Sequence, residues 1–247
     1  MKITFLGTSH GVPAADRYCA CTMLEVNGAT YFIDAGAPLI DILLRRGTDL
    51  NTIRALFTTH LHGDHVNGVL AFADLINWYF KTARAQIWLT EKEGVSLFRQ
   101  LITLTEGMAI DESRVNFRTE KPGPFYEDEN LRVTAIPTQH MAYASRPSYA
   151  LLLEAEGKHV LFTGDLSHQL EKGDFPACAM SEPLDLMVME MAHFGVKEAA
   201  PYLEKCTAKQ LYVQHVFPLD KYPQIEALSG KYGYPVFTPR DGDEVEL

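Results

Sequence analysis

The sequence predicts an α/β protein in which two β-rich layers are covered by helices on their outer faces. Three observations lead to this prediction: short strands and helices alternate along the chain, hairpin turns occur early in each half, and helices separate the later strands. Layers of this kind let sheets and helices bury their apolar faces against one another. No linker rich in Pro, Ser or Gly interrupts the chain, so we expect one domain over residues 1–247.

The first half is expected to begin with a strand and a hairpin and to continue with alternating helices and strands. The pair Asn27-Gly28 predicts the hairpin, because this dipeptide fits the tightest hairpin turn. Gly47 is expected to end the first helix. The expected strands cover residues 2–6, 22–26, 30–34, 54–59 and 87–90. The expected helices cover residues 38–46, 66–80 and 91–104.

The second half is expected to open with irregular sequence around residues 121–124. The pair Glu156-Gly157 then predicts a second hairpin turn. The expected strands cover residues 131–136, 149–154, 159–163, 184–189 and 210–213. The expected helices cover residues 197–206 and 222–232.

Composition limits the partners of the chain. With 47% hydrophobic residues, 22% charged residues and a net charge of −10, it is typical of a soluble globular protein. The negative charge argues against long nucleic acid, which needs a broad basic face, but it allows a small anionic substrate beside a bound metal. The N-terminus lacks the apolar core of a signal peptide and no apolar run could span a bilayer, so we expect a cytoplasmic protein without a membrane partner.

The most informative stretch is the turn that follows the expected strand 54–59. It brings His60, His62, Asp64 and His65 within six positions. Buried imidazoles and carboxylates each need a polar partner, so such a cluster is a poor solution to core packing. The same groups are usual ligands of divalent transition metals. A chance cluster of surface histidines is the alternative, and the density of ligand-type residues favours a metal site.

Three further ligand-type residues are expected just beyond the ends of strands. They are His140, Asp165 and His215. Taken singly, each could be a capping or solvated group, but α/β folds place their sites at such strand ends. The seven candidates exceed what one zinc ion needs, whereas two ions about 3.5–4 Å apart would use them. We therefore expect two divalent metal ions, zinc before manganese or iron.

These motifs resemble those of the metallo-β-lactamase superfamily over nearly the whole chain. The superfamily's metal motifs are matched in order by His60-x-His62-x-Asp64-His65, His140, Asp165 and His215. The resemblance implies a four-layer αββα metallo-β-lactamase sandwich. Asp34 fits the superfamily's early structural Asp, and the opening residues 5–13 are similar to the start of the ribonuclease Z branch.

The chain departs from ribonuclease Z enzymes in two places. His140 and Asp165 are only 25 positions apart, which leaves no room for the tRNA-binding arm that these enzymes usually carry there. The branch's His-Glu-Ala-Thr box has lost its histidine here, and His193 instead follows Glu190 by three positions. This acid-x-x-His arrangement resembles the cyclic-phosphate phosphodiesterase of phosphonate breakdown, in which such a histidine is taken to be the general acid.

The resemblance implies a role for each candidate. One metal would be held by His60, His62 and His140, the other by Asp64, His65 and His215, with Asp165 as the bridge. A hydroxide between the metals would be the nucleophile. Asp64 would orient it, and His193 would donate a proton to the leaving group. His168 and Arg146 are weaker candidates for substrate contacts. A surface histidine explains His168 at least as well, and an exposed loop arginine is the more common outcome for a residue such as Arg146.

The sequence therefore predicts a dinuclear metal-dependent hydrolase that acts on small phosphodiesters. Cyclic nucleotides, cyclic sugar phosphates and short oligonucleotides are the expected substrates. Two alternatives stay open, a thioester or lactone hydrolase of the same fold and a catalytically silent metal-binding sensor. The complete ligand set argues against the sensor. A homodimer is the default expectation for the assembly.

Overall fold

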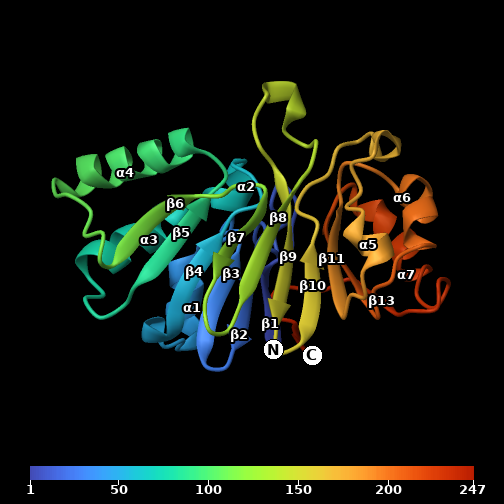
Figure 1. Ribbon diagram of the computed structural model, residues 1–247, viewed down its shortest axis with the longest axis horizontal. Helices are drawn as coiled ribbons and strands as arrows, with labels where there is room; N and C mark the ends of the chain where they lie inside the picture. The colour runs from blue at the N-terminus through green and yellow to red at the C-terminus, as the bar shows by residue number, and fades with distance from the viewer.

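The computed structural model describes residues 1–247, and its centre consists of two seven-stranded sheets (Figure 1). The first sheet contains, in spatial order, β14 (Glu244–Glu246), β1 (Lys2–Gly7), β2 (Cys21–Val26), β3 (Ala29–Ile33), β4 (Ile53–Phe57), β5 (Ala85–Leu89) and β6 (Val115–Thr119). The second contains β13 (Val236–Phe237), β12 (Leu211–Val216), β11 (Leu186–Met191), β10 (Lys158–Phe162), β9 (Tyr149–Ala155), β8 (Arg132–Pro137) and β7 (Gly123–Glu127).

Helices lie on the two outer sides of this pair of sheets (Figure 1). The helices beside the first sheet are α1 (Leu39–Arg46), α3 (Val69–Trp78) and α4 (Lys92–Glu106). Those beside the second sheet are α5 (Cys178–Ser181), α6 (Val196–Leu203) and α7 (Tyr222–Glu226). Short helical segments at the strand ends and in loops are α2 (Gly63–Val66), η1 (Leu50–Thr52), η2 (Ala142–Ala144), η3 (Leu170–Lys172) and η4 (Leu219–Lys221).

Three apolar layers hold this arrangement together. Between the sheets, fully buried Phe5 and Phe57 belong to the same cluster as Phe162 of the second sheet. On the outer side of the first sheet, Phe32 packs edge-to-face on Phe72 of α3, with ring centroids 5.8 Å apart. A third cluster joins the second sheet to α5, α6 and α7. Burying side chains of this size contributes about 1.5–3 kcal/mol each, and the resulting order of layers confirms the expected αββα sandwich.

Each sheet combines antiparallel hairpins with parallel strands. In the first sheet β1, β2 and β3 pair antiparallel and β3 to β6 run parallel; in the second, β7 to β10 pair antiparallel and β10 to β13 run parallel. Both expected hairpins are confirmed, and Asn27 and Gly28 take the positive φ angles, 49° and 78°, that a tight hairpin turn requires. Parallel strands end at one edge, and this edge carries the site.

Several expected elements were wrong in detail where tertiary contacts override the local pattern. The expected helix 66–80 is interrupted: α2 ends at Val66, α3 begins at Val69, and the Gly68 N–H between them donates to the Ala35 main-chain oxygen at 2.6 Å. β7 begins at Gly123, inside the segment 121–124 that was expected to be irregular, and β6 was not expected. The expected helix 222–232 ends at Glu226, and the short strands β13 and β14 have no periodic signal in the sequence.

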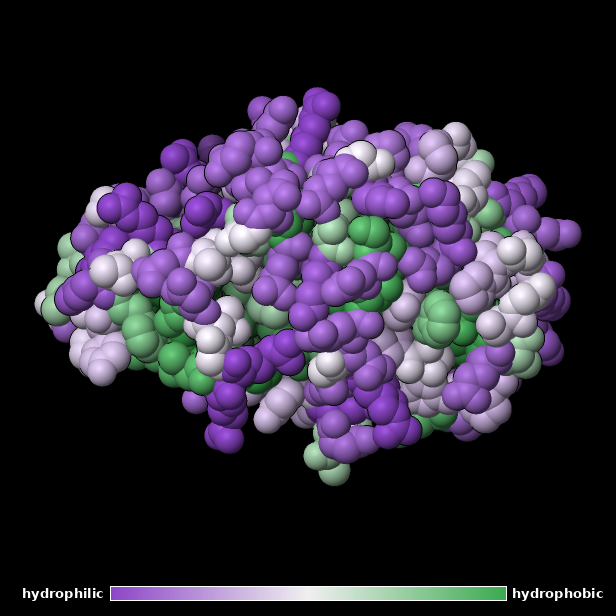
Figure 2. All heavy atoms as spheres, turned by 90° about the horizontal axis from the view of Figure 1, so that it is seen from below, coloured by the Kyte–Doolittle hydropathy of each residue, from purple (hydrophilic) through white to green (hydrophobic).

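The surface at the end of the molecule that carries both termini is largely hydrophilic, with hydrophobic residues in small groups between polar ones (Figure 2). The turn after β4, together with α2, lies at the opposite end (Figure 1). None of the helices combines the length and the apolar character needed to cross a lipid bilayer.

Candidate metal centre

The histidine-rich turn after β4 is held in place by the carboxylate of Asp34, which follows β3. Its Oδ1 accepts a hydrogen bond from the Thr59 main-chain N–H at 2.7 Å, and its Oδ2 lies 2.7 Å from His65 Nδ1. This contact leaves His65 Nε2 to face the cluster. Close packing also fixes the turn, because a Cβ on Gly36 would lie 1.6 Å from the main-chain oxygen of Asp64. The structure thus places Asp34 where the resemblance implied.

The other candidate ligands reach the same point from the second sheet. His140 follows β8, Asp165 follows β10, and His215 lies near the end of β12. At His215 the pairing of β11 with β12 shifts register, and the residue takes a positive φ of 52°. A bulge of this kind redirects a side chain. Here the bulge occurs at His215, whose Nε2 lies 3.1 Å from Asp64 Oδ2.

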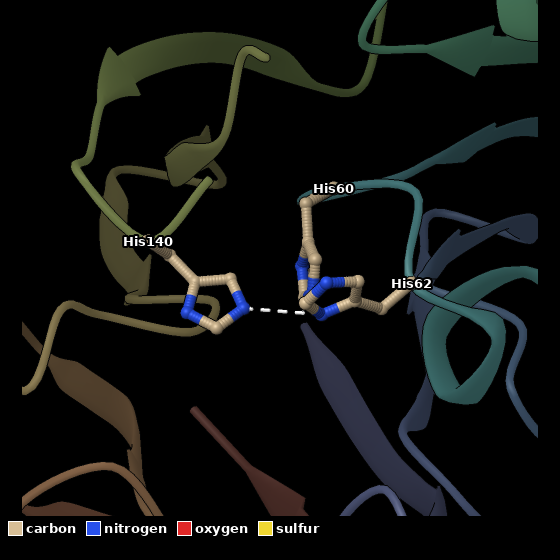
Figure 3. Close-up of side chains that lie close together, drawn as sticks. All are labelled: His60, His62 and His140. Carbon is tan, nitrogen blue, oxygen red and sulfur yellow. Dashed lines mark hydrogen bonds between the residues drawn. The ribbon is translucent and has the colours of Figure 1, made fainter. Parts of the chain in front are cut away.

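Three imidazoles form the first group of potential ligands. His60 and His62 come from the turn after β4, and His140 approaches from the opposite loop (Figure 3). His140 Nε2 lies 3.1 Å from His62 Nδ1, and the ring centroids of His60 lie 4.7 Å from those of both other histidines. Their ligand nitrogens lie within 4.8 Å of one another, which is close enough to hold one ion.

Asp64, His65 and His215 form the second group. His65 Nε2 lies 3.4 Å from His215 Nε2 and 3.5 Å from Asp64 Oδ2. Asp165 lies between the two groups, with Oδ1 3.5 Å from His65 Nε2 and Oδ2 3.7 Å from both His140 Nε2 and His215 Nε2. All seven candidate ligands therefore converge.

The geometry fits divalent metal ions. Ligand atoms about 2.0–2.1 Å from a tetrahedral zinc ion are roughly 3.3 Å apart, and the separations within the two groups cluster around that value. His60 Nε2 is buried without a hydrogen-bond partner and faces Asp165 Oδ2 at 3.8 Å. An unpaired buried nitrogen of this kind costs free energy unless it binds something. Nitrogen and carboxylate ligands suit zinc, manganese and iron.

Electrostatics keep most of these groups in the protonation state that binds a metal. Burial lowers the pKa of His60 well below 6.5 and that of His140 to about 4, so both imidazoles are neutral. Burial opposes ionisation of Asp165, but the surrounding histidines outweigh it and hold its pKa well below 3.8. Metals bind neutral imidazole and ionised carboxylate, so these three groups are prepared for binding.

His193 and Glu190 lie at the edge of the cluster. Glu190 is buried at the end of β11, and its Oε1 lies 3.0 Å from His193 Nδ1. Burial lowers the pKa of His193, but the hydrogen bond to Glu190 raises it more, to about 9. The ring of His193 is 4.5 Å from that of His140. The acid-x-x-His pattern therefore places an imidazolium beside the potential metal ligands.

A pocket of about 580 Å³ adjoins the first group of ligands. His62, His140 and His193 form one side of it, and His168, Lys172 and Tyr143 are among the other lining residues. His168 thus lies where a substrate contact was expected. Arg146 does not line this pocket, because its guanidinium pairs with Glu91 Oε1 at 3.2 Å.

Sequence reasoning missed one residue that contacts a candidate ligand and one that contacts the His193 turn. Tyr143 belongs to η2, in the loop between β8 and β9, which protrudes from the rest of the fold (Figure 1). The Tyr143 hydroxyl lies 3.0 Å from His62 Nε2. This contact occupies the nitrogen that does not face His140, so it helps to orient the His62 ring. The second is Lys221, whose ammonium contacts the turn that carries His193. Tyr143 lies only three positions after His140, and Lys221 six after His215. Neither residue type is a usual metal ligand, so no sequence signal pointed to them.

Glu120, a buried acid outside the set of candidate ligands, stabilises the turn through the main chain of Thr58. Glu120 Oε1 accepts a hydrogen bond from the Thr58 N–H at 3.1 Å, while its Oε2 is buried without a partner. Burial raises the pKa of Glu120 well above 4.5. The folded state therefore binds this proton more tightly than the unfolded state, and stability falls as the pH rises above 4.5 through the folded pKa.

We expect Glu120→Gln to raise the free energy of unfolding by about 1 kcal/mol or more at about pH 8 and to change it little at about pH 5. Glutamine keeps the acceptor for Thr58 but carries no charge to bury. Urea denaturation at both pH values measures the difference, with the exposed Glu226→Gln as control. An equal change at both pH values would contradict the assigned cause.

Comparison with known proteins places the chain in a family. Residues 1–180 match the family described as Anti-Pycsar protein Apyc1, which is more than half of the chain. The chain belongs to this family. Curated relatives of this Apyc1-family chain include ribonuclease Z of Listeria innocua, 29% identical over 143 residues that make up 57% of this chain and 46% of the relative. Ribonuclease Z of Methanocaldococcus jannaschii is 26% identical over 154 residues, 62% of this chain and 47% of the relative.

The chain spans about half the length of the curated relatives it matches. Among solved structures, the metallo-β-lactamase fold protein YhfI from Bacillus subtilis superposes with a TM-score of 0.78 at 18% identity, covering 100% of this chain and 99% of that one. Human tRNase Z, short form, gives a TM-score of 0.72 at 18% identity with the same coverage. The expected metallo-β-lactamase fold is thereby confirmed, and the chain is similar to ribonuclease Z enzymes, as its opening residues indicated.

Proposed function

We propose that this chain is a metal-dependent phosphodiesterase that acts on small phosphodiesters with two bound divalent ions, zinc before manganese or iron. The observation that carries the proposal is the position of the Glu190–His193 pair beside the converging ligands. An alkoxide that leaves phosphorus is a strong base and needs a proton, whereas the thiolate of a thioester needs none. A proton donor at this edge therefore favours phosphodiesters over thioesters.

Each side chain has a defined part in this proposal. The ions would be held by His60, His62 and His140 on one side, by Asp64, His65 and His215 on the other, and by Asp165 between them. Bound divalent ions would supply a hydroxide at neutral pH by lowering the pKa of water from 15.7 to about 7. Asp64 would accept a hydrogen bond from the attacking oxygen and so orient it.

The step balances in atoms and charge. The attacking oxygen bonds to phosphorus, the bond from phosphorus to the leaving oxygen breaks, and His193 Nε2 transfers its proton to that oxygen. The carboxylate of Glu190 stabilises the protonated imidazole beforehand through Nδ1. The neutral imidazole then regains a proton from solvent, which accounts for the one released when the attacking water ionises.

The pocket supports a small substrate. Its volume of about 580 Å³ lies within the usual range for small-molecule sites, about 300–1,000 Å³. Lys172 and His168 on its wall offer donors to an anionic or polar group. The net charge of −10 opposes extended contact with long nucleic acid. We propose that residues 1–247 act as one domain, with cyclic nucleotides, cyclic sugar phosphates and short oligonucleotides as substrate candidates.

A panel of substrates tests the proposal. Purified protein with quantified metal would be offered bis(p-nitrophenyl) phosphate, cyclic nucleotides, a thioester and a lactone. We expect turnover of the phosphodiesters and a loss of more than about 100-fold in Asp64→Ala, because a metal ligand contributes at least as much as the outer residues that orient it. Activity only on the thioester or lactone would overturn the proposal. Metal binding without any turnover would favour a sensor.

A further inference from the structure

The turn that carries His193 is contacted by a lysine that has no part in the proposed reaction. Lys221 ends η4, and its ammonium donates hydrogen bonds to three main-chain oxygens in the segment 191–194. The distances are 2.9 Å to Met191, 3.2 Å to Ala192 and 2.7 Å to Phe194. An ammonium group has three N–H donors, so this one turn satisfies all of them.

Glu190 holds the same turn from inside. Its Oε2 accepts hydrogen bonds from the main-chain N–H groups of Ala192 and His193, at 2.6 Å and 3.1 Å. Its Oε1 accepts one from Leu166, at 3.0 Å, and so ties the turn to the loop of Asp165. Main-chain donors of the turn thus point to a buried carboxylate, and main-chain acceptors point to an ammonium. The backbone around His193 is fixed on both sides by charge-assisted hydrogen bonds.

We infer that Lys221 is a positioning residue that holds the His193 turn so that its imidazole reaches the leaving oxygen of the substrate. The inference rests on the proposed phosphodiesterase function. Without the ammonium, the carbonyl groups of Ala192 and Phe194 lose this donor, Met191 keeps only the Phe217 N–H, and the turn can shift relative to the proposed metal ligands. A displacement on the order of 1 Å in a reacting group can cost about 100-fold in rate. The metal ligands themselves come from other segments, so metal binding stays intact.

The test compares leaving groups in Lys221→Met, which keeps the length of the side chain and removes the charge. Methyl aryl phosphates with phenols of rising pKa serve as substrates, because p-nitrophenolate leaves without a proton and phenolate benefits from one. We expect kcat to fall about tenfold more for the phenyl than for the p-nitrophenyl ester, with KM and bound metal nearly unchanged. Lys221→Arg should restore much of the loss, and the exposed Lys81→Met is the matched control.

Two further measurements separate positioning from general damage. In a His193→Ala background, Lys221→Met should have no additional leaving-group effect, since both changes act through one group. Hydrogen–deuterium exchange at the amides of residues 192 and 193 should be faster in Lys221→Met and unchanged in Lys81→Met. This readout needs no turnover, so it tests Lys221 even if the proposed function fails. An equal loss for both esters, an additive effect with His193→Ala, or unchanged exchange would each overturn the inference.

Discussion

Replacing Asp165 with alanine is expected to lower kcat on phosphodiesters by more than about 100-fold and to reduce the metal bound per chain. Changes in residues that only orient metal ligands already cost about 10–100-fold in metal affinity or activity. Asp165 is itself a candidate ligand, so its loss should cost at least as much. Its carboxylate faces five imidazoles at 3.5–3.8 Å, those of His60, His65, His140, His193 and His215.

The experiment compares steady-state kinetics and bound metal in Asp165→Ala, Asp165→Asn and the parent chain. Asparagine keeps the size of the side chain but removes the charge, so it should retain little of the activity. The exposed Asp220→Ala controls for the loss of one carboxylate from the chain. Full metal content and normal kcat in Asp165→Ala would contradict a bridging role.

Zinc added to metal-free protein is expected to raise the melting temperature by about 5–10 °C. An ion at about 100 times its dissociation constant stabilises the folded state by about 2.7 kcal/mol. In a chain of this size each kcal/mol shifts the midpoint by about 2–4 °C. The physical reason is the burial of His60, His65, His140, Asp165 and His215, which is only partly compensated by contacts within the cluster.

Differential scanning fluorimetry after chelation, with and without zinc, manganese or magnesium, measures this shift. Zinc and manganese should stabilise more than magnesium, which prefers an oxygen cage with several waters. Asp165→Ala should lose most of the shift. His159→Ala, near the start of β10 and away from the ligands that follow its end, should keep it. No shift with any ion would contradict the proposed metal centre.

The seven residues that the structure brings together could be chosen from the sequence, because residue types that bind metals are rare enough to stand out locally. His60, His62, Asp64 and His65 fall in one turn, and His140 and Asp165 follow strands whose apolar patterns are clear. The structure brings all of them, with His215, to one edge of the two sheets. Both hairpins were also predictable, since Asn-Gly and Glu-Gly turns accept the positive φ angles that the structure shows.

Other features of the site and the fold were not predicted from the sequence around them. The bulge that accompanies the turn of His215 toward Asp64 depends on the pairing of β11 with β12. Tyr143 and Arg146 lie in the same loop, yet only Tyr143 contacts a candidate ligand, because Arg146 pairs with Glu91. β6 was missed although Val115 and Phe117 alternate with polar residues, and β7 was missed because Gly123 and Pro124 indicate a turn.

The sequence by itself determined which groups can bind metal, because residue type and spacing decide ligand chemistry. It also determined the order of layers, through the alternation of strands and helices. Only the tertiary structure decided that the seven candidate ligands meet at one edge of the two sheets and which residues hold the His193 turn. Those outcomes depend on contacts between segments far apart in the chain, such as Lys221 with Phe194 and Asp34 with His65. Such contacts follow from the packing of the two sheets, which no single stretch of sequence encodes.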